Sequence, residues 1–363
     1  MQHKLKQTGE HAYFAASNSR SGFYSYYEQS FRGRVDRLFC IKGGPGTGKS
    51  TFMRTVARQG EKRGMRAEYY YCSSDADSLD AVLLFGEKGS IGLIDATAPH
   101  AFEPTLPGVR EEIVDLGQFW DSLRLISCGK EILSLNQRKS AGYRNAYRHL
   151  AGVGELSDVL RSLVESCMDM DKLHRLCTRL LRDTPKGQSE HAQIALSDSI
   201  GMRGRVRLDT YLQKATRLCL IEDYHDSAYI LTDLLAQGAA QAAQDRRISH
   251  HPILPDRVDA LWLTSTNTAF VVCSQEQTAE LSEQLPHARI ISMRRMVLKD
   301  MFRAVREEAR RVDRIRGTLL DEACIQMQKV ADAHFALEQI YTSAMDFAAK
   351  ERFTTEFCRK VFQ

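Results

Sequence analysis

The stretch GGPGTGKS, residues 43–50, has the residue types and the spacing needed to hold phosphate groups. It fits the pattern GxxxxGK(S/T), in which glycines allow backbone N–H groups to close around phosphate oxygens. A helix that begins at Lys49 would point its N-terminus at the phosphates, where the helix dipole favours anions. The Lys49 ammonium would reach the β- and γ-phosphates, and the Ser50 hydroxyl would coordinate Mg²⁺.

The loop lies between the apolar run LFCI and an amphipathic segment, so we predict a nucleotide site here and not a glycine-rich structural turn. The predicted contacts to the nucleotide are Gly43, Gly44, Pro45, Gly46, Thr47, Gly48, Lys49, Ser50 and Thr51.

A second Mg²⁺ ligand is expected at the end of a neighbouring strand, and the apolar run IGLID supplies Asp95 there. The alternative is an aspartate that ends a strand in a turn, and we favour the Mg²⁺ ligand. Ala96 follows, so the position has no glutamate to polarise water as in many motor ATPases. The chain also lacks an NKxD guanine-reading motif. ATP is therefore the expected nucleotide, with Lys49 and Asp95 as the catalytic candidates.

The segment CSSDADSLD, residues 72–80, follows the second predicted strand and collects polar side chains in one short loop. Such a loop emerges at the carboxyl end of the sheet, where open α/β folds bind ligands. Ser73, Ser74, Asp75 and Asp77 therefore contact either a substrate or Mg²⁺-bound water. Serine and aspartate are also the usual caps of helices and turns, and this second interpretation stays open.

Composition places the chain among ordinary cytoplasmic proteins. Its 363 residues are 43% hydrophobic and 26% charged, with a net charge of +4, so we expect neither a nucleic acid nor a membrane as partner. Its nine cysteines include no CxxC pair and several lie in apolar runs, which indicates buried free thiols. The polar beginning of the sequence is not that of a secretory signal.

The sequence contains an internal repeat. HAYFAASNS at His11 resembles HAQIALSDS at His191, and the pairs Arg37-Leu38 and Arg217-Leu218 keep the same separation. We therefore predict a first repeat at 1–183, a polar linker at 184–190 and a second repeat at 191–363.

Each repeat has the pattern of a short apolar strand, a helix, a second strand and a strand hairpin, followed by a long helical tail at 129–183 or 296–362. The predicted fold is α/β, with tandem duplicated P-loop NTPase-like domains. Each would have a mainly parallel sheet flanked by helices and a helical tail.

The second repeat serves as an internal control for the site. Its six loop residues shrink to the four residues DYHD, and Ser227 and Ala228 stand where the first repeat has Lys49 and Ser50. Cys273 stands where the first repeat has Asp95. We therefore expect the second repeat to keep the scaffold and to bind no nucleotide. Asp80 of the first repeat has a counterpart, Asp259, in the second repeat. A residue that both repeats share belongs to the scaffold, which favours a capping role for Asp80.

Four segments, taken in order, resemble a family of uncharacterised bacterial ATPases from Firmicutes with tandem phosphate-loop domains. They are HAYFAASNSRSGFYSYYEQ, GGPGTGKST, CSSDADSLD and LIDATAPHAFEP. The resemblance is close in the first half and loose in the second. It implies P-loop NTPase folds and ATP binding at residues 43–51, and it supplies no reaction. In the family the second half often keeps its own glycine loop, and DYHD departs from that pattern.

The expected function is Mg-ATP binding by the first repeat, with hydrolysis or transfer of the γ-phosphate. One alternative is a small-molecule or nucleotide kinase whose acceptor faces 73–77. Another is a non-catalytic scaffold, gated by nucleotide, whose helical tails bind a protein partner. The sequence names neither an acceptor nor a partner.

Overall fold

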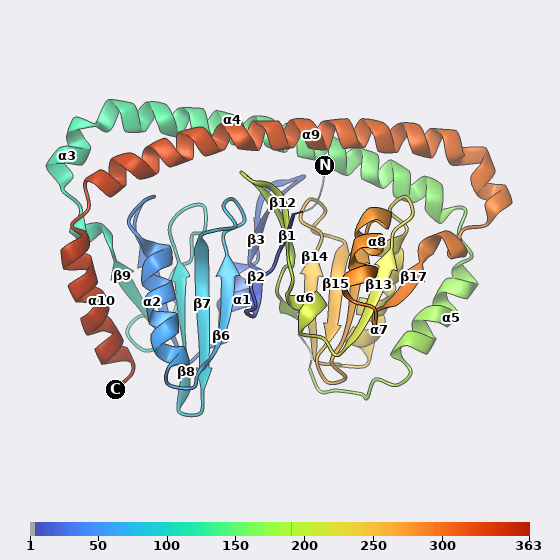
Figure 1. The fold of residues 1–363 in the computed structure, drawn as a ribbon, viewed down its shortest axis with the longest axis horizontal. Coiled ribbons are helices and arrows are strands. Elements are labelled where there is room, and N and C mark those ends of the chain that lie inside the picture. The colour runs from blue at the N-terminus through green and yellow to red at the C-terminus, as the bar shows by residue number, and fades with distance from the viewer. Residues whose placement is uncertain (1–3, 190) are drawn as a thin grey trace.

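The computed structural model describes residues 4–189 and 191–363, and its core is a pair of six-stranded sheets with the same strand order (Figure 1). The first sheet consists, from edge to edge, of β2 (Ala12–Phe14), β6 (Arg66–Tyr71), β7 (Leu79–Gly86), β8 (Gly89–Asp95), β5 (Arg37–Lys42) and β9 (Glu111–Asp115). The second consists of β10 (Gln193–Ile194), β14 (Arg246–His250), β15 (Val258–Leu263), β16 (Thr268–Cys273), β13 (Arg217–Glu222) and β17 (Arg289–Ser292). Residue 190, the last of the predicted linker, lies outside the described residues, as do residues 1–3.

Strand directions are the same in the two sheets. β7 and β15 pair antiparallel with both neighbours, and the other neighbouring strands pair in parallel. The hairpin predicted around residues 86–89 is confirmed, because Gly86 pairs with Gly89 at the turn from β7 to β8. The molecule is thus a mixed α/β protein with parallel strands flanked by helices, as the sequence indicates.

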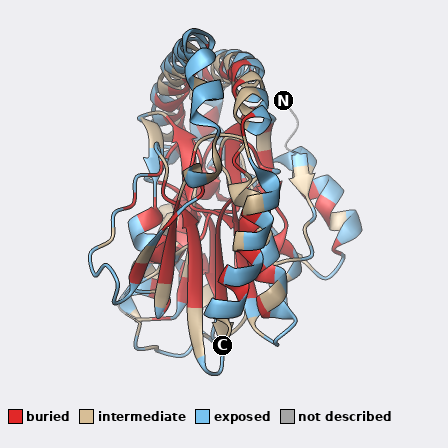
Figure 2. Ribbon diagram, turned by 90° about the vertical axis from the view of Figure 1, so that its left-hand side faces the viewer, coloured by how far each residue is buried: buried red, intermediate tan, exposed pale blue. Residues whose placement is uncertain are grey.

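A helix follows the strand next to one edge of each sheet. β5 leads through the loop into α2 (Lys49–Glu61), and β13 leads into α7 (Ala228–Gln241). The inner face of α2 buries Phe52, Met53 and Val56 against the sheet, at the spacing of one helical face. Figure 2 shows the result, with buried strands in the centre and exposed outer faces on the helices.

Two small hairpins lie between the sheets. β3 (Ala16–Ser19) pairs with β4 (Gly22–Ser25), and β11 (Asp198–Gly201) pairs with β12 (Gly204–Leu208). The strand β1 (Lys4–Lys6), from the beginning of the chain, adds to β12 in parallel, so the first repeat completes a sheet of the second. The remaining short helices are α1 (Tyr27–Phe31), η1 (Gly117–Phe119), α3 (Ser122–Ser127), α6 (Thr210–Gln213), α8 (Gln275–Gln284) and η2 (Met293–Met296).

The helical tails form two long arms that cross the whole molecule. The first arm is α4 (Gly129–Glu165) with α5 (Met170–Leu181), and the second is α9 (Lys299–Ser343) with α10 (Phe347–Val361). α4 and α9 lie side by side and run in opposite directions above both sheets (Figure 1). Among the described residues, no helix is both long and apolar enough to cross a membrane.

Each arm ends on the sheet of the other repeat. α5 packs against α7 of the second repeat, whereas α10 packs against α2 of the first. Phe357 of α10 contacts Phe39 and Phe52, with ring centroids 4.9 and 5.1 Å apart. The segments 1–183 and 191–363 therefore divide the sequence into repeats, but either compact half of the molecule includes a helix of the other repeat.

Candidate functional site

The glycine loop turns at the carboxyl end of β5, and two of its glycines are required by the backbone. Gly46 has φ +70° and Gly48 has φ +75°, a region that other residues rarely adopt. Space is also short, because a Cβ on Gly46 would lie 2.5 Å from the carbonyl oxygen of Glu338 in α9. These two positions accept only glycine, and the second arm presses directly on the loop.

Lys49 spans the loop at the first position of α2. Its Nζ donates hydrogen bonds to the carbonyl oxygens of Gly43 and Gly44, both at 2.8 Å. The same Nζ lies 3.4 Å from Oδ2 of Asp95. The ammonium group is thus held inside the loop by weak acceptors and one carboxylate, and a phosphate would offer it a stronger partner.

Asp95 and Ser50 lie on adjacent elements, as the sequence predicts. Asp95 ends β8, whose register places it beside Ile41 of β5, and Ser50 is in the first turn of α2. The Ser50 hydroxyl accepts a hydrogen bond from the N–H of Leu79 at 3.0 Å. Asp95 Oδ1 accepts one from the N–H of Thr97 at 2.9 Å, so it supports a turn while its other oxygen faces Lys49.

A cavity of about 410 Å³ opens beside the loop. The first repeat contributes residues 45–51 together with Cys72, Ser74, Asp75, Ser78, Leu79, Asp80 and Asp95. The second repeat contributes Met202, His334, Glu338 and Phe347. No local motif points to these four residues, because Met202 comes from the turn between β11 and β12, and the other three reach the loop through the crossing of the arms.

The second arm also contacts the loop backbone. Thr342 Oγ1 donates a hydrogen bond to the carbonyl of Gly46, and Lys350 Nζ donates one to the carbonyl of Gly48, each at 3.3 Å. Lys350 is buried, and burial lowers the pKa of its ammonium group. The glycine loop is therefore in contact with the ends of two helices from the other repeat.

The polar loop at 72–80 is divided between the cavity and structural roles. Ser74 and Asp75 line the cavity, and the Ser74 hydroxyl contacts the Tyr143 hydroxyl of α4 at 2.9 Å. Asp77 lies away from the cavity and forms an ion pair with Lys6 at 2.9 Å. Ser73 is buried, and its carbonyl accepts a hydrogen bond from the Ser199 hydroxyl.

Arg203 supports this loop from the second repeat. It forms ion pairs with both Asp75 and Asp77, each at 2.9 Å. Asp75 also accepts a hydrogen bond from the Ser78 hydroxyl at 3.1 Å. Of the four predicted substrate contacts, the structure thus places Ser74 and Asp75 in the wall of the cavity, and Ser73 and Asp77 outside it.

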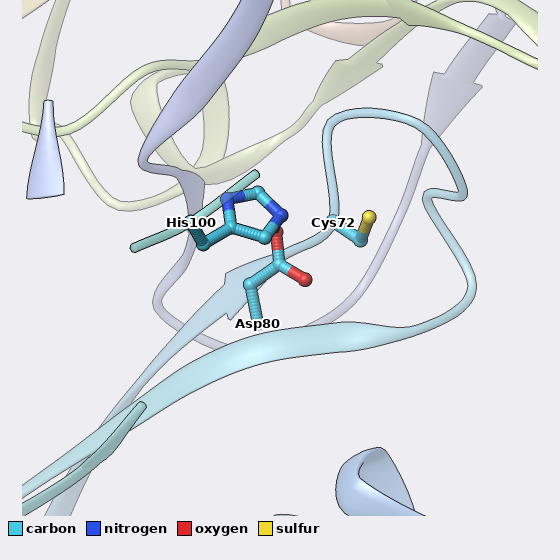
Figure 3. Close-up of side chains that lie close together, drawn as sticks. All are labelled: Cys72, Asp80 and His100. Atoms are coloured by element: carbon cyan, nitrogen blue, oxygen red, sulfur yellow. Dashed lines mark ion pairs between the residues drawn. The ribbon is translucent and has the colours of Figure 1, made fainter. Parts of the chain in front are cut away.

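Asp80, which lines the cavity, forms a buried pair with His100 behind it (Figure 3). His100 Nε2 lies 3.3 Å from Asp80 Oδ2, and the ligand atoms of Cys72, Asp80 and His100 all lie within 4.8 Å of one another. Burial raises the pKa of both Asp80 and the Cys72 thiol. The repeat comparison favours a capping role for Asp80. The structure instead brings its carboxylate to His100, whose ring stacks on Tyr27 at 4.9 Å.

The second repeat holds a different arrangement at the equivalent place. The backbone N–H of His251 donates a hydrogen bond to the carbonyl of Arg257 at 2.9 Å. In the first repeat the backbone N–H of Cys72 donates one to the carbonyl of Ser78 in the same way, at 3.0 Å. Asp259, the counterpart of Asp80, pairs with the buried Arg207 at 3.0 Å. The carboxylate of the second repeat is thus neutralised by a permanent cation, whereas that of the first faces a histidine.

The loop of the second repeat is filled by its own carboxylates. Asp223 accepts hydrogen bonds from the N–H groups of Asp226 at 3.0 Å and of Ala228 at 2.9 Å. Burial and the neighbouring Asp226 raise the pKa of Asp223 to about 6. The backbone donors that a phosphate loop would aim at a nucleotide are therefore already used.

Comparison with known proteins gives one partial match. A model of the family described as "Nephrocystin 3, N-terminal" matches residues 25–84, a segment that includes the glycine loop, α2 and the polar loop. No curated protein and no solved structure matches the chain.

Proposed function

We propose that this chain is a cytoplasmic P-loop protein that binds Mg-ATP in its first repeat and hydrolyses it or transfers its γ-phosphate. The observation that carries the proposal is Lys49, held at the start of α2 inside a glycine loop that closes on the carboxyl end of a parallel strand. A triphosphate at this position would meet an ammonium group, a helix N-terminus and backbone N–H groups of the loop.

The residues beside Lys49 fit a magnesium ion. Ser50 and Asp95 both line the cavity and supply a hydroxyl and a carboxylate, which are oxygen ligands of the kind that Mg²⁺ prefers. Magnesium would neutralise charge that develops on the phosphates. Lys49 would stabilise the same charge from the other side, so these residues act mainly by electrostatic stabilisation.

Family resemblance adds support to the nucleotide assignment. The partial match to the nephrocystin family covers the glycine loop, and the segments 43–51, 72–80 and 93–104 resemble tandem phosphate-loop ATPases of Firmicutes. In this proposal the second repeat is a pseudo-domain without nucleotide, because Asp223 occupies its loop donors.

Two other functions each have an observation in their favour. A kinase acting on a small acceptor is supported by Ser74 and Asp75, which line the same cavity as Lys49. A nucleotide-gated scaffold is supported by Thr342 and Lys350, because a change in the loop would reach the arms directly. Turnover of ATP, measured with and without candidate acceptors, separates hydrolysis, phosphoryl transfer and binding without reaction.

Binding of ATP is tested first with Lys49→Ala. The variant removes a charge-assisted contact to phosphate, and we expect Mg-ATP affinity to fall at least about tenfold in titration calorimetry. Lys62→Ala is the matched control, because Lys62 is an exposed lysine at the far end of the same helix and should change nothing. Equal affinities for wild type and Lys49→Ala would refute the site.

A further inference from the structure

The two arms correspond residue by residue. Asp346 donates its N–H to the carbonyl of Phe119, and Asp169 donates its N–H to the carbonyl of Met296, both at 2.9 Å. Phe119 therefore corresponds to Met296, and Asp169 to Asp346. The stretch between the two corresponding points has the same length in both repeats, so the helices α4 and α9 align without a gap.

On this correspondence, Lys139 of α4 occupies the position of Arg316 of α9. Arg316 lines a cavity of about 210 Å³ in the second repeat, which lies beside the loop that replaces the glycine loop. Its Nη1 lies 2.5 Å from Oδ1 of Asp226. The second repeat thus shows what the arm does there: it places a cation on an anion at the loop.

The anion in the second repeat is part of the chain itself. Asp223 takes up the loop N–H groups, which is the position of an inner phosphate in a phosphate loop. Asp226 lies further out, between Arg316 of the arm and Arg257 at 2.9 Å. The Asp226 carboxylate therefore stands where an outer phosphate would meet the arm.

In the first repeat the corresponding cation forms no ion pair among the described residues, and Glu338 of the cavity wall is a nearby carboxylate that partly offsets the effect of burial on the pKa of Lys139. Lys139 is half-buried, and it has no hydrogen-bond or ion-pair partner among the residues that the structure describes. Lys139 lies on the same face of α4 as Tyr143, one helical turn further along, and the Tyr143 hydroxyl contacts Ser74 of the cavity wall. Burial lowers the pKa of Lys139, and the nearby Lys49 contributes in the same direction.

We propose that Lys139 binds the terminal phosphate of the nucleotide, as Arg316 binds the carboxylate of Asp226. This role rests on the proposed Mg-ATP site and adds a second cation to it, delivered by the arm. Because ADP lacks the terminal phosphate, Lys139 would let the arm distinguish ATP from ADP. The contact would also stabilise charge on the transferring group, as cationic side chains do in other phosphoryl-transfer sites.

The test compares Mg-ATP with Mg-ADP in titration calorimetry on the full chain. We expect Lys139→Ala to weaken ATP binding about tenfold or more, the effect of losing a hydrogen bond to a charged group, and to leave ADP binding within about twofold. Lys139→Arg should restore the preference for ATP. Arg138→Ala is the matched control, because Arg138 is the exposed neighbour, and it should behave as wild type.

The outcomes separate the two proposals. Lys49→Ala should weaken both nucleotides, since Lys49 also contacts the inner phosphates. If wild type binds both nucleotides and Lys139→Ala weakens neither, or weakens both equally, the role of Lys139 is overturned and the site stands. If wild type binds neither nucleotide, the site and the role of Lys139 are both overturned.

Discussion

Two carboxylates, one at the end of β8 in the first repeat and one in the loop after β13 in the second, behave differently at the scale of single residues. Asp95 has one oxygen on the Thr97 N–H and the other near Lys49, so it is held by a turn and still faces the cavity. Asp223 has both oxygens on loop N–H groups and faces no ligand. Only the first of these arrangements leaves a carboxylate oxygen for a metal ion.

Asp95→Asn tests whether that oxygen serves magnesium. The amide keeps the size of the side chain and an oxygen for the Thr97 N–H, but it loses the charge that attracts a divalent ion. We expect the Mg²⁺ dependence of ATP binding or turnover to decrease while the fold, followed by circular dichroism, is retained. An unchanged Mg²⁺ titration would assign Asp95 to the turn alone.

At the scale of elements, the two sheets are joined along β2, β6 and β14 by a buried charge cluster. Glu68 of β6 is fully buried and contacts Arg247 of β14 at 2.6 Å, Arg66 at 2.7 Å and Arg34 at 3.0 Å. Burial by itself would raise the pKa of Glu68, but Arg247 and Arg34 outweigh it, and the pKa is lowered to about 2.

This cluster predicts sensitivity to acid. A carboxylate whose pKa is lowered on folding stabilises the fold above its ordinary pKa near 4.5, and this stabilisation is lost as the pH falls toward 2. Glu68→Gln should lower stability by roughly 3 kcal/mol at neutral pH, with a smaller difference from wild type near pH 3. Urea titrations at both pH values measure the effect.

Glu112→Gln is the control for that experiment. Glu112 pairs with Arg37 at the partly exposed edge of the first sheet, where an ion pair contributes at most about 1 kcal/mol. If Glu68→Gln is as stable as Glu112→Gln at neutral pH, the cluster does not hold the sheets together.

At the scale of the whole molecule, the chain is a duplicated fold whose halves have exchanged helices. α10 covers α2 beside the glycine loop, and α5 covers α7 beside the filled loop. The second repeat thus contributes to the site of the first without a phosphate loop of its own. The proposed site therefore depends on the arm of a repeat that has no glycine loop at the equivalent place.

The asymmetry predicts one nucleotide per chain. The Asp223 carboxylate takes up the loop N–H groups of the second repeat, and Asp226 takes up Arg257 and Arg316, so the donors and cations that a triphosphate would need are already paired. Native mass spectrometry with a non-hydrolysable ATP analogue should therefore detect a single bound nucleotide, which Lys49→Ala removes. Two nucleotides per chain would contradict the interpretation of the second repeat as a pseudo-domain.

Local patterns in the sequence were sufficient for much of the fold. The spacing of glycines at 43–48, the apolar run before them and the helical period after them predict a strand, a loop and a helix, and β5 and α2 confirm these elements. The glycines at 86 and 89 between two apolar runs predicted the hairpin, and the three- and four-residue apolar spacing predicted the helical tails. These features depend on residues close together in the chain, so hydrophobic period and glycine conformation determine them.

The tertiary structure decided which segments meet. An amphipathic helix shows that one face must be buried, but its sequence does not specify which surface buries it. Only the crossing of the arms brings Glu338 and Lys350 to the glycine loop, and only the packing of β7 brings Asp80 to His100. These contacts join residues far apart in the chain. The contacts of the arm arise because each repeat buries apolar surface under a helix of the other repeat, α10 on α2 and α5 on α7.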